Sequence, residues 1–207
     1  MNKVLVLFAH PVYQTSLVNK TLLAALPDSE FVTFHDLYEA YPDFLIDVHY
    51  EQQLLNDHDV IVFQHPLYWF SSPAILKEWM DLVLEHGYAY GTEGRALEGK
   101  QFISAISTGS DVVNYKGDRN IRNLLKPFEF TAKLCNMQYL PPFITYSGLK
   151  IKAGNFDQRL TQDYLSEQAG RYAYLLNELI QGNISEQECD AFNTMNQRYD
   201  TLEIHND

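Results

Sequence analysis

The sequence is poor in cysteine and lacks the side-chain spacing of a metal site. Its two cysteines, Cys135 and Cys189, are far apart and form no CxxC pair. A disulfide framework or a structural zinc site is therefore unsupported. The seven histidines show no HxH or HxxxH spacing, so we expect no bound metal.

Positive charge is also scarce. The chain has 15 basic and 27 acidic side chains and a formal net charge of −12. Such a chain is a poor candidate for binding nucleic acid or anionic lipid by charge alone. No apolar run approaches the roughly 20 residues of a membrane span. The N-terminus leads from Met1 directly into a strand-like run and lacks a signal-peptide pattern, so we expect a cytoplasmic protein.

Several common ligand-binding and catalytic motifs are missing. The GxGxxG that follows the first strand of a dinucleotide-binding domain is absent, and so are the glycines and lysine of a P-loop. The GxSxG turn of an α/β hydrolase is absent as well. These absences argue against a dinucleotide-binding sheet, a P-loop enzyme and a serine hydrolase.

What is present indicates one well-packed domain. Hydrophobic residues make up 46% of the 207 residues, which argues against disorder and suffices for a sizeable core. Five apolar runs are typical of strands: residues 4–9, 31–35, 60–63, 101–106 and 139–146. Helical periodicity predicts helices between and after these runs, near residues 17–26, 51–57, 73–83, 127–137 and 156–181.

Alternating strands and helices predict an α/β fold. With the other motifs absent, we expect a flavodoxin-like three-layer sandwich with a five-stranded parallel sheet in the order 2-1-3-4-5. Pro141 and Pro142 place the last strand at an edge. We assign residues 1–182 to this flavodoxin-like domain, in which a flavin site would lie at the carboxyl ends of the first and third strands, and residues 183–207 to an acidic C-terminal tail with a short helix. That tail either docks on a partner or is disordered.

The stretch of residues 60–80, VIVFQHPLYWFSSPAILKEWM, organises the rest of the chain. It reads as a buried strand, an aromatic loop and a helix, with Ser72 as N-cap and Pro73 as first helical residue. Open α/β sheets bind ligands at loops that follow the carboxyl ends of strands. An aromatic loop at that place favours a flat, partly apolar ligand.

Three loops are expected to converge on one crevice: residues 10–19, 66–70 and 107–110. Ser16 and Asn19 lie at a helix N-terminus, where hydroxyls and backbone N–H groups can hold a phosphate; ordinary helix capping is the alternative. The aromatic residues 68–70 could flank an isoalloxazine ring or form a hydrophobic plug over the sheet. Gly109 would let the backbone approach a ring closely.

Several segments together resemble the NAD(P)H:quinone oxidoreductase family of flavodoxin-like flavoproteins. They are KVLVLFAHP with a following SLVN, FQHPLYWFSSPAILKEWMD, HGYAYG and STG, spread over roughly residues 3 to 180. HDLYEAYPDFLID, EQQLLNDHDVIVFQHPLY and LKPFEF are similar to the small ancillary proteins of bacterial glutathione-regulated potassium-efflux systems.

This resemblance implies an FMN-dependent homodimeric NAD(P)H dehydrogenase, with FAD as the alternative cofactor. NAD(P)H would give a hydride to the flavin and leave, and a quinone would then accept two electrons in a ping-pong cycle. The resemblance also implies a membrane potassium-efflux antiporter as partner, which would place the protein on the cytoplasmic face of the inner membrane. The alternative function is a regulatory subunit that activates a glutathione-gated potassium/proton antiporter with little or no turnover of its own.

Site residues carry over from the family by position. Tyr115 matches a tyrosine that assists charge relay, and Tyr90 matches a substrate-pocket aromatic supplied by the partner subunit. The residues matched to cofactor binding are His10, Ser16, Leu17, Val18, Asn19, Pro66, Leu67, Tyr68, Trp69, Phe70, Ser107, Thr108, Gly109 and Ser110.

Three positions depart from the family pattern. Ile121 stands where the larger relatives have a relay histidine, Tyr68 where many members have glutamine, and Ser110 where glycine is usual. These departures bear on quinone turnover more than on flavin binding. An electron-transfer flavodoxin is disfavoured, because FAHPVYQTS is not the hydroxyl-rich phosphate loop of flavodoxins.

Overall fold

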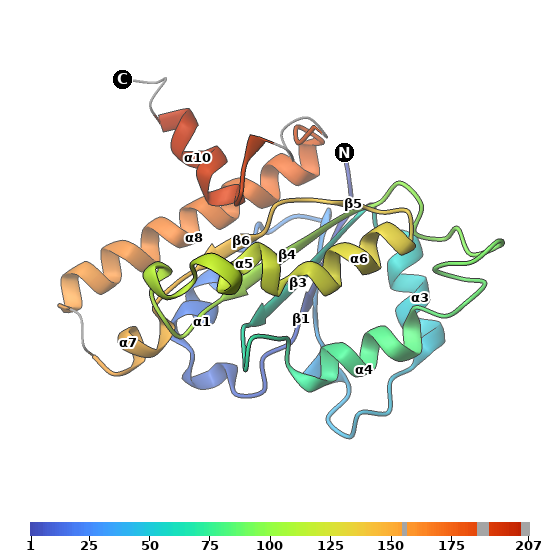
Figure 1. Cartoon of the computed structure of the whole chain (residues 1–207), viewed down its shortest axis with the longest axis horizontal. Coiled ribbons are helices and arrows are strands. Elements are labelled where there is room, and N and C mark those ends of the chain that lie inside the picture. Colours follow the sequence, from blue (N-terminus) through green and yellow to red (C-terminus); the bar gives the residue numbers. More distant parts are fainter. Residues whose placement is uncertain (155–156, 186–190, 204–207) are drawn as a thin grey trace.

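One parallel sheet lies at the centre of the molecule (Figure 1). The computed structural model describes residues 1–154, 157–185 and 191–203. The strands are β1 (Val4–Phe8), β2 (Val32–Asp36), β3 (Val60–Pro66), β4 (Gln101–Ser107), β5 (Gln138–Tyr139) and β6 (Phe143–Thr145). They run in the order β2-β1-β3-β4-β5, and β6 also pairs with β4. The predicted order is confirmed, with a sixth strand added.

The longest apolar runs form the central strands because both of their faces are covered. Every residue of β1 and of β3 is buried. Successive side chains of a strand point to opposite faces of the sheet. Accordingly, Leu5 and Leu7 belong to one core cluster, whereas Val4 and Val6 belong to the other.

Helices cover both faces of the sheet (Figure 1). One face carries α1 (Leu17–Ala24), α7 (Gly148–Lys152), α8 (Gln158–Gln181) and α10 (Met195–Glu203). The other carries α2 (Leu37–Ala40), α3 (Val48–Asp57), α4 (Ala74–Val83), α5 (Ile121–Leu124) and α6 (Lys126–Leu134). Short 3₁₀ turns lie at Tyr13–Thr15, Val112–Asn114 and Gly117–Arg119. This is the predicted three-layer sandwich.

Helix ends follow the capping signals in two cases and depart from them in one. The Ser16 side chain caps α1 by accepting a hydrogen bond from the Asn19 N–H, and Gly182 ends α8 in a left-handed conformation. The prediction that Ser72 caps α4 is wrong. Pro73 is the N-cap, because its ψ of 152° is still extended and not helical.

The predicted fifth strand, residues 139–146, is interrupted. Prolines at 141 and 142 have no N–H to donate to a sheet ladder. The chain therefore pairs with β4 in two pieces, as Gln101↔Gln138 in β5 and as Ile106↔Ile144 in β6. Residue 156, the predicted start of the last long helix, lies outside the described residues, and α8 begins at Gln158.

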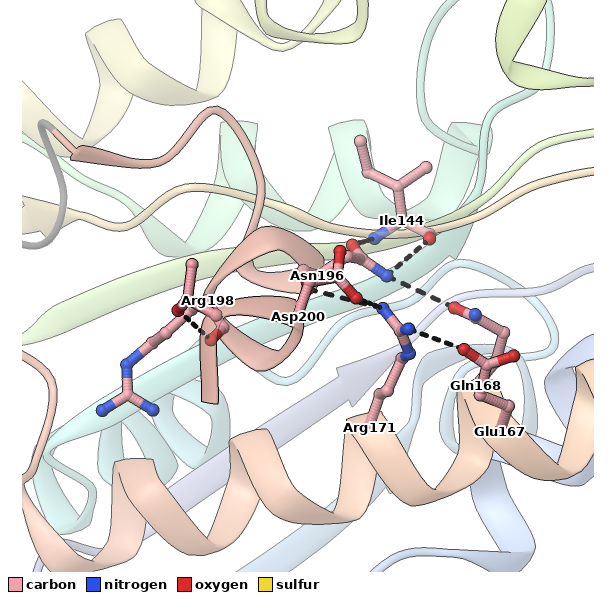
Figure 2. A network of polar contacts seen from close by, with 8 residues as sticks. Ile144, Glu167, Gln168, Arg171, Asn196, Arg198 and Asp200 are labelled. Carbon is pink, nitrogen blue, oxygen red and sulfur yellow. Dashed lines mark hydrogen bonds and ion pairs between the residues drawn. The ribbon is translucent and has the colours of Figure 1, made fainter. Parts of the chain in front are cut away.

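The C-terminal segment returns to the outer edge of the sheet (Figure 2). The Asn196 side chain forms two hydrogen bonds with the backbone of Ile144 on β6, at 2.9 and 3.1 Å. On α8, Arg171 pairs with Glu167 and also with Asp200 of α10. The predicted short helix of the tail is thus α10, packed on α8 and β6. Residues 186–190, which include Cys189, and 204–207 lie outside the described residues.

Candidate functional site

A pocket of about 310 Å³ opens at the carboxyl ends of β1, β3 and β4. Parallel strands all point the same way, so the loops after them meet at one edge of the sheet. The loops at residues 10–19, 66–70 and 107–110 all contribute lining residues, as expected. The predicted residues that line the pocket are His10, Ser16, Val18, Pro66, Leu67, Tyr68, Trp69, Ser107, Thr108 and Gly109.

His10 is a buried, neutral side chain in the first loop. Its Nδ1 accepts a hydrogen bond from the Val12 N–H at 3.2 Å, so this nitrogen carries no proton. Burial, with a smaller contribution from the nearby charge of Lys152, lowers the pKa of His10 to about 4. At neutral pH, His10 therefore contributes a hydrogen-bonding imidazole and no charge.

Asn19 ties the first loop to the end of β4. It is only 1% exposed, and its Nδ2 donates to Ser16 Oγ at 3.1 Å and to Ser107 Oγ at 3.0 Å. Its Oδ1 is buried and has no hydrogen-bond partner among the described residues. Asn19 thus lies behind the pocket lining and holds Ser16 and Ser107 in place.

The second loop is a tight turn with an unusual backbone. Tyr68 and Ser71 exchange two backbone hydrogen bonds, both at 2.9 Å. Between them, Trp69 and Phe70 have φ angles of 51° and 63°. Turns with two positive φ angles favour Asn-Gly, and each bulky residue in such a conformation costs about 1–3 kcal/mol.

The side chains of this turn are held at the rim of the pocket. Trp69 is 95% exposed, and Phe70 is half exposed. Within the described part of the chain, the N–H groups of Trp69 and Phe70 donate to no acceptor. Strain, exposed aromatic rings and unused donors together indicate that this turn is shaped to contact a ligand or partner.

The third loop is packed closely against α7. The Gly148 N–H donates to Thr108 O at 2.8 Å, and the Leu149 N–H donates to Gly109 O at 3.1 Å. A Cβ on Gly109 would lie 2.7 Å from Leu149 Cδ1, so any larger residue would push Leu149 aside. Glycine at this position therefore lets α7 form a fourth wall of the pocket.

Four lining residues were missed by sequence reasoning: Thr15, Gly148, Leu149 and Lys152. Three of them belong to α7, which follows the broken edge strand. The available signal was the pair of lysines in GLKIK, placed just after a strand in an otherwise acidic chain. Lys152 Nζ donates to Thr15 Oγ1 at 3.1 Å, which links α7 to the first loop.

The charge of the lining is opposite to that of the chain. None of the lining residues, all of which lie in the described ranges, is an aspartate or glutamate, and Lys152 is the charged one. Asp111 lies just outside and binds Ser147 and Lys150 of the α7 segment. The hydrogen bond from Lys150, followed by that from Ser147, lowers the pKa of the Asp111 carboxyl, which therefore stays ionised.

Other predicted site residues lie beside the pocket or away from it. Leu17, Phe70 and Ser110 adjoin lining residues without lining the pocket themselves. The Tyr115 ring packs on Tyr146, with ring centroids 5.9 Å apart. The Tyr90 ring packs edge-on against His86. Neither tyrosine lines this pocket within one chain, and their roles stay predictions.

With this geometry in view, the similarity to known proteins can be stated. Residues 2–166 match the model of the Flavodoxin_2 family, which has a flavodoxin-like fold. The chain belongs to this family. The chain is 53% identical over 148 residues to the glutathione-regulated potassium-efflux system ancillary protein KefG of Yersinia pestis. The match covers 70% of this chain and 81% of that protein. The predicted resemblance is confirmed.

Solved structures show the same fold. General stress protein 14 of Treponema denticola, in complex with FMN, has 37% identity and a TM-score of 0.77, covering 86% of this chain and 99% of that one. An NADPH-quinone reductase of P. pentosaceus has 32% identity and a TM-score of 0.67, with 83% and 97% covered. A protein of S. violaceusniger named a thermophilic tryptophan halogenase has 43% identity and a TM-score of 0.73, with 81% and 95% covered. Because these names differ, similarity establishes the fold and leaves the reaction to be argued from the site.

Proposed function

We propose that the pocket binds FMN and that the protein is an NAD(P)H:quinone oxidoreductase. The observation that carries this proposal is the pocket itself, which combines an acid-free lining, a lysine at one end and a strained aromatic turn at its rim. The FMN bound to general stress protein 14 of Treponema denticola and the quinone reductase activity named for the P. pentosaceus protein support it. FAD stays the alternative cofactor.

The residues present fit FMN in chemical type. His10, Thr15 and Ser16, with the N-terminal N–H groups of α1, offer hydrogen bonds to a phosphate. Leu67, Tyr68 and Trp69 offer apolar and aromatic surface to a flavin ring. The N–H groups of Gly109 and Ser110, which donate to no acceptor within the described ranges, offer donors to the polar edge of the ring.

Bound flavin would supply the redox chemistry, carrying two electrons from NAD(P)H to a quinone. The chain itself would orient the cofactor and stabilise negative charge with donors that are already fixed in place. Gly109 contributes such a donor because α7 holds the turn of residues 107–110 in one conformation. We propose that Tyr115 assists charge relay from beside the pocket and that the enzyme is a homodimer, in which Tyr90 faces the pocket of the partner subunit.

A regulatory role is the second candidate function. Similarity to KefG favours it, because that protein is named as ancillary to a potassium-efflux system. Ile121, at the position of the relay histidine, is 5% exposed and packs in the core. Its aliphatic side chain can neither donate nor accept a proton. In this role the flavin-loaded protein would activate a potassium/proton antiporter at the inner membrane. None of the described helices is long and apolar enough to cross a bilayer itself.

A comparison of turnover with transporter activation separates the two functions. The FMN-loaded protein should oxidise NADPH or NADH in the presence of a benzoquinone, and Tyr115→Phe should lower kcat while leaving FMN bound. Reconstitution with the antiporter gives the second readout. If Tyr115→Phe activates potassium efflux as well as the wild type does, regulation does not require turnover. No NAD(P)H oxidation by the flavin-loaded wild type would contradict the enzyme proposal.

A further inference from the structure

The position of α7 places a positive charge at one end of the pocket, which none of the sequence motifs predicted. Lys152 lies in the lining with Thr15, and its ammonium group donates to the Thr15 hydroxyl at 3.1 Å. Thr15 directly precedes Ser16, the cap of α1. The ammonium group therefore lies at the same end of the pocket as the helix N-terminus and the hydroxyls of the first loop.

Two sets of contacts hold α7 in this place. Backbone hydrogen bonds run from Ser147, Gly148 and Leu149 to the carbonyls of residues 108–110. The Asp111 carboxylate binds the Ser147 hydroxyl and the Lys150 ammonium group from outside the pocket. Lys150 is thereby paired with a carboxylate, whereas Lys152, two residues further along α7, reaches the pocket.

The other polar groups at this end are neutral or donate hydrogen bonds. His10 is uncharged at neutral pH because its pKa is lowered to about 4. The N–H groups of Leu17 and Val18, in the first turn of α1, donate to no acceptor in the part of the chain that the structure describes. Among the residues that the structure describes, no carboxylate lines the pocket to neutralise Lys152. Such a set of groups is complementary to a dianion and not to a neutral hydroxyl.

We propose that Lys152 is a specificity-determining residue, which pairs with the terminal phosphate monoester of the flavin and makes the site prefer FMN to riboflavin. The inference rests on the proposed flavin function and adds the residue that recognises the charge of the ligand. A charge-assisted hydrogen bond to phosphate is expected to contribute about tenfold or more in affinity. Asp111 is a positioning residue, since it acts through α7.

The test is a titration of the full-length, flavin-free protein with FMN and with riboflavin, followed by the change in flavin fluorescence. Lys152→Gln removes the charge and Lys152→Arg retains it. Lys20→Gln is the matched control, because Lys20 is an exposed lysine of α1 outside the pocket. We expect Lys152→Gln to raise the Kd for FMN about tenfold and to leave the Kd for riboflavin within twofold. Lys152→Arg and Lys20→Gln should both stay close to the wild type.

Salt and inorganic phosphate give a second readout. The preference of the wild type for FMN should shrink as salt is raised, because the added ions screen the pair. Millimolar inorganic phosphate should compete with FMN and not with riboflavin if Lys152 recognises the phosphate group. Equal loss of both flavins in Lys152→Gln, or equal affinity of the wild type for both, would overturn the inference and leave the flavin function standing. A wild type that binds neither flavin would overturn both.

Discussion

At the scale of single residues, two histidines beside the pocket are held in the neutral form by burial. His65 is fully buried, its Nδ1–H donates to the Pro66 carbonyl at 2.9 Å, and its ring lies against Phe128. Burial lowers the pKa of His65 to about 4, although the Pro66 hydrogen bond opposes this shift. His10 has a similar pKa for the same main reason. Both histidines therefore resist protonation as long as the chain is folded.

This resistance predicts a pH-dependent stability. In the unfolded chain a histidine takes up its proton near pH 6.5, whereas in the fold it does so only near pH 4. Between these values the unfolded chain binds more protons, so the free energy of unfolding should be highest above pH 6.5 and fall as pH drops toward 4. Urea titrations of the flavin-free protein at pH 7.0, 6.0 and 5.0 would measure this.

His65→Gln isolates the contribution of one histidine. Glutamine retains a donor for the Pro66 carbonyl and does not titrate. The fall in unfolding free energy between pH 6 and 5 should then be shallower than in the wild type, by up to about 1.4 kcal/mol per pH unit. An unchanged slope would mean that His65 takes up its proton in the fold at the same pH as in the unfolded chain.

At the scale of elements, the turn at residues 68–71 lowers the stability of the fold through backbone strain and, by the same conformation, exposes two aromatic rings. Two adjacent aromatic residues occupy positions at which a two-residue turn favours Asn-Gly. The strain persists because the turn is held between buried β3 and the start of α4. The rings that cause this strain are the ones exposed at the rim of the pocket.

Replacing Trp69 by Asn and Phe70 by Gly tests whether the strained aromatic turn lowers stability and raises FMN affinity. The double variant should gain about 1 kcal/mol of unfolding free energy by relief of strain and lose about tenfold in FMN affinity by loss of the aromatic rim. Denaturant titration and FMN titration measure the two effects. Trp69→Phe, which keeps both strain and aromatic surface, is the control and should change neither. A less stable double variant would show that ring packing outweighs the strain.

The elements that could be predicted from sequence are those whose local residue pattern matches their environment in the fold. Unbroken apolar runs predicted β1, β3 and β4, and the His-Pro and aromatic segments after them predicted most of the pocket lining. α7 could not be predicted, because its five residues follow a strand broken by prolines and carry no long periodic pattern. Lys152 and Thr15 come together only through α7. Their pairing therefore could not be predicted from the sequence.

At the scale of the whole molecule, the end of the chain protects an edge of the sheet. The outer edge of β6 would expose the N–H and C=O groups of Ile144, and an exposed edge can pair with another chain. Asn196 satisfies both groups from α10 (Figure 2). The Met195 N–H also donates to Pro142 O at 3.0 Å. The family match ends at residue 166, so Asn196 and the rest of α10 lie beyond it, whereas Ile144 lies within it.

Asn196→Ala should therefore destabilise the molecule. It leaves the polar groups of Ile144, a residue that is 1% exposed, without partners, at a cost of about 1–3 kcal/mol. Denaturant titration measures the change, and hydrogen exchange at the Ile144 amide should become faster. Asn193→Ala, an exposed neighbour before α10, is the matched control and should stay within about 0.5 kcal/mol of the wild type. An equal effect of both variants would contradict the edge-sealing role.

The central claim is that the pocket at the ends of β1, β3 and β4 is a flavin site, and the most direct test is to count the FMN that the purified full-length protein retains. The protein would be saturated with FMN, freed of excess ligand and denatured, and the released cofactor would be separated chromatographically. The account predicts FMN at about one molecule per chain, bound less tightly after substitution of Lys152 or of the Trp69–Phe70 pair. A protein that retains no flavin after saturation, and whose fluorescence does not respond to FMN, would contradict it.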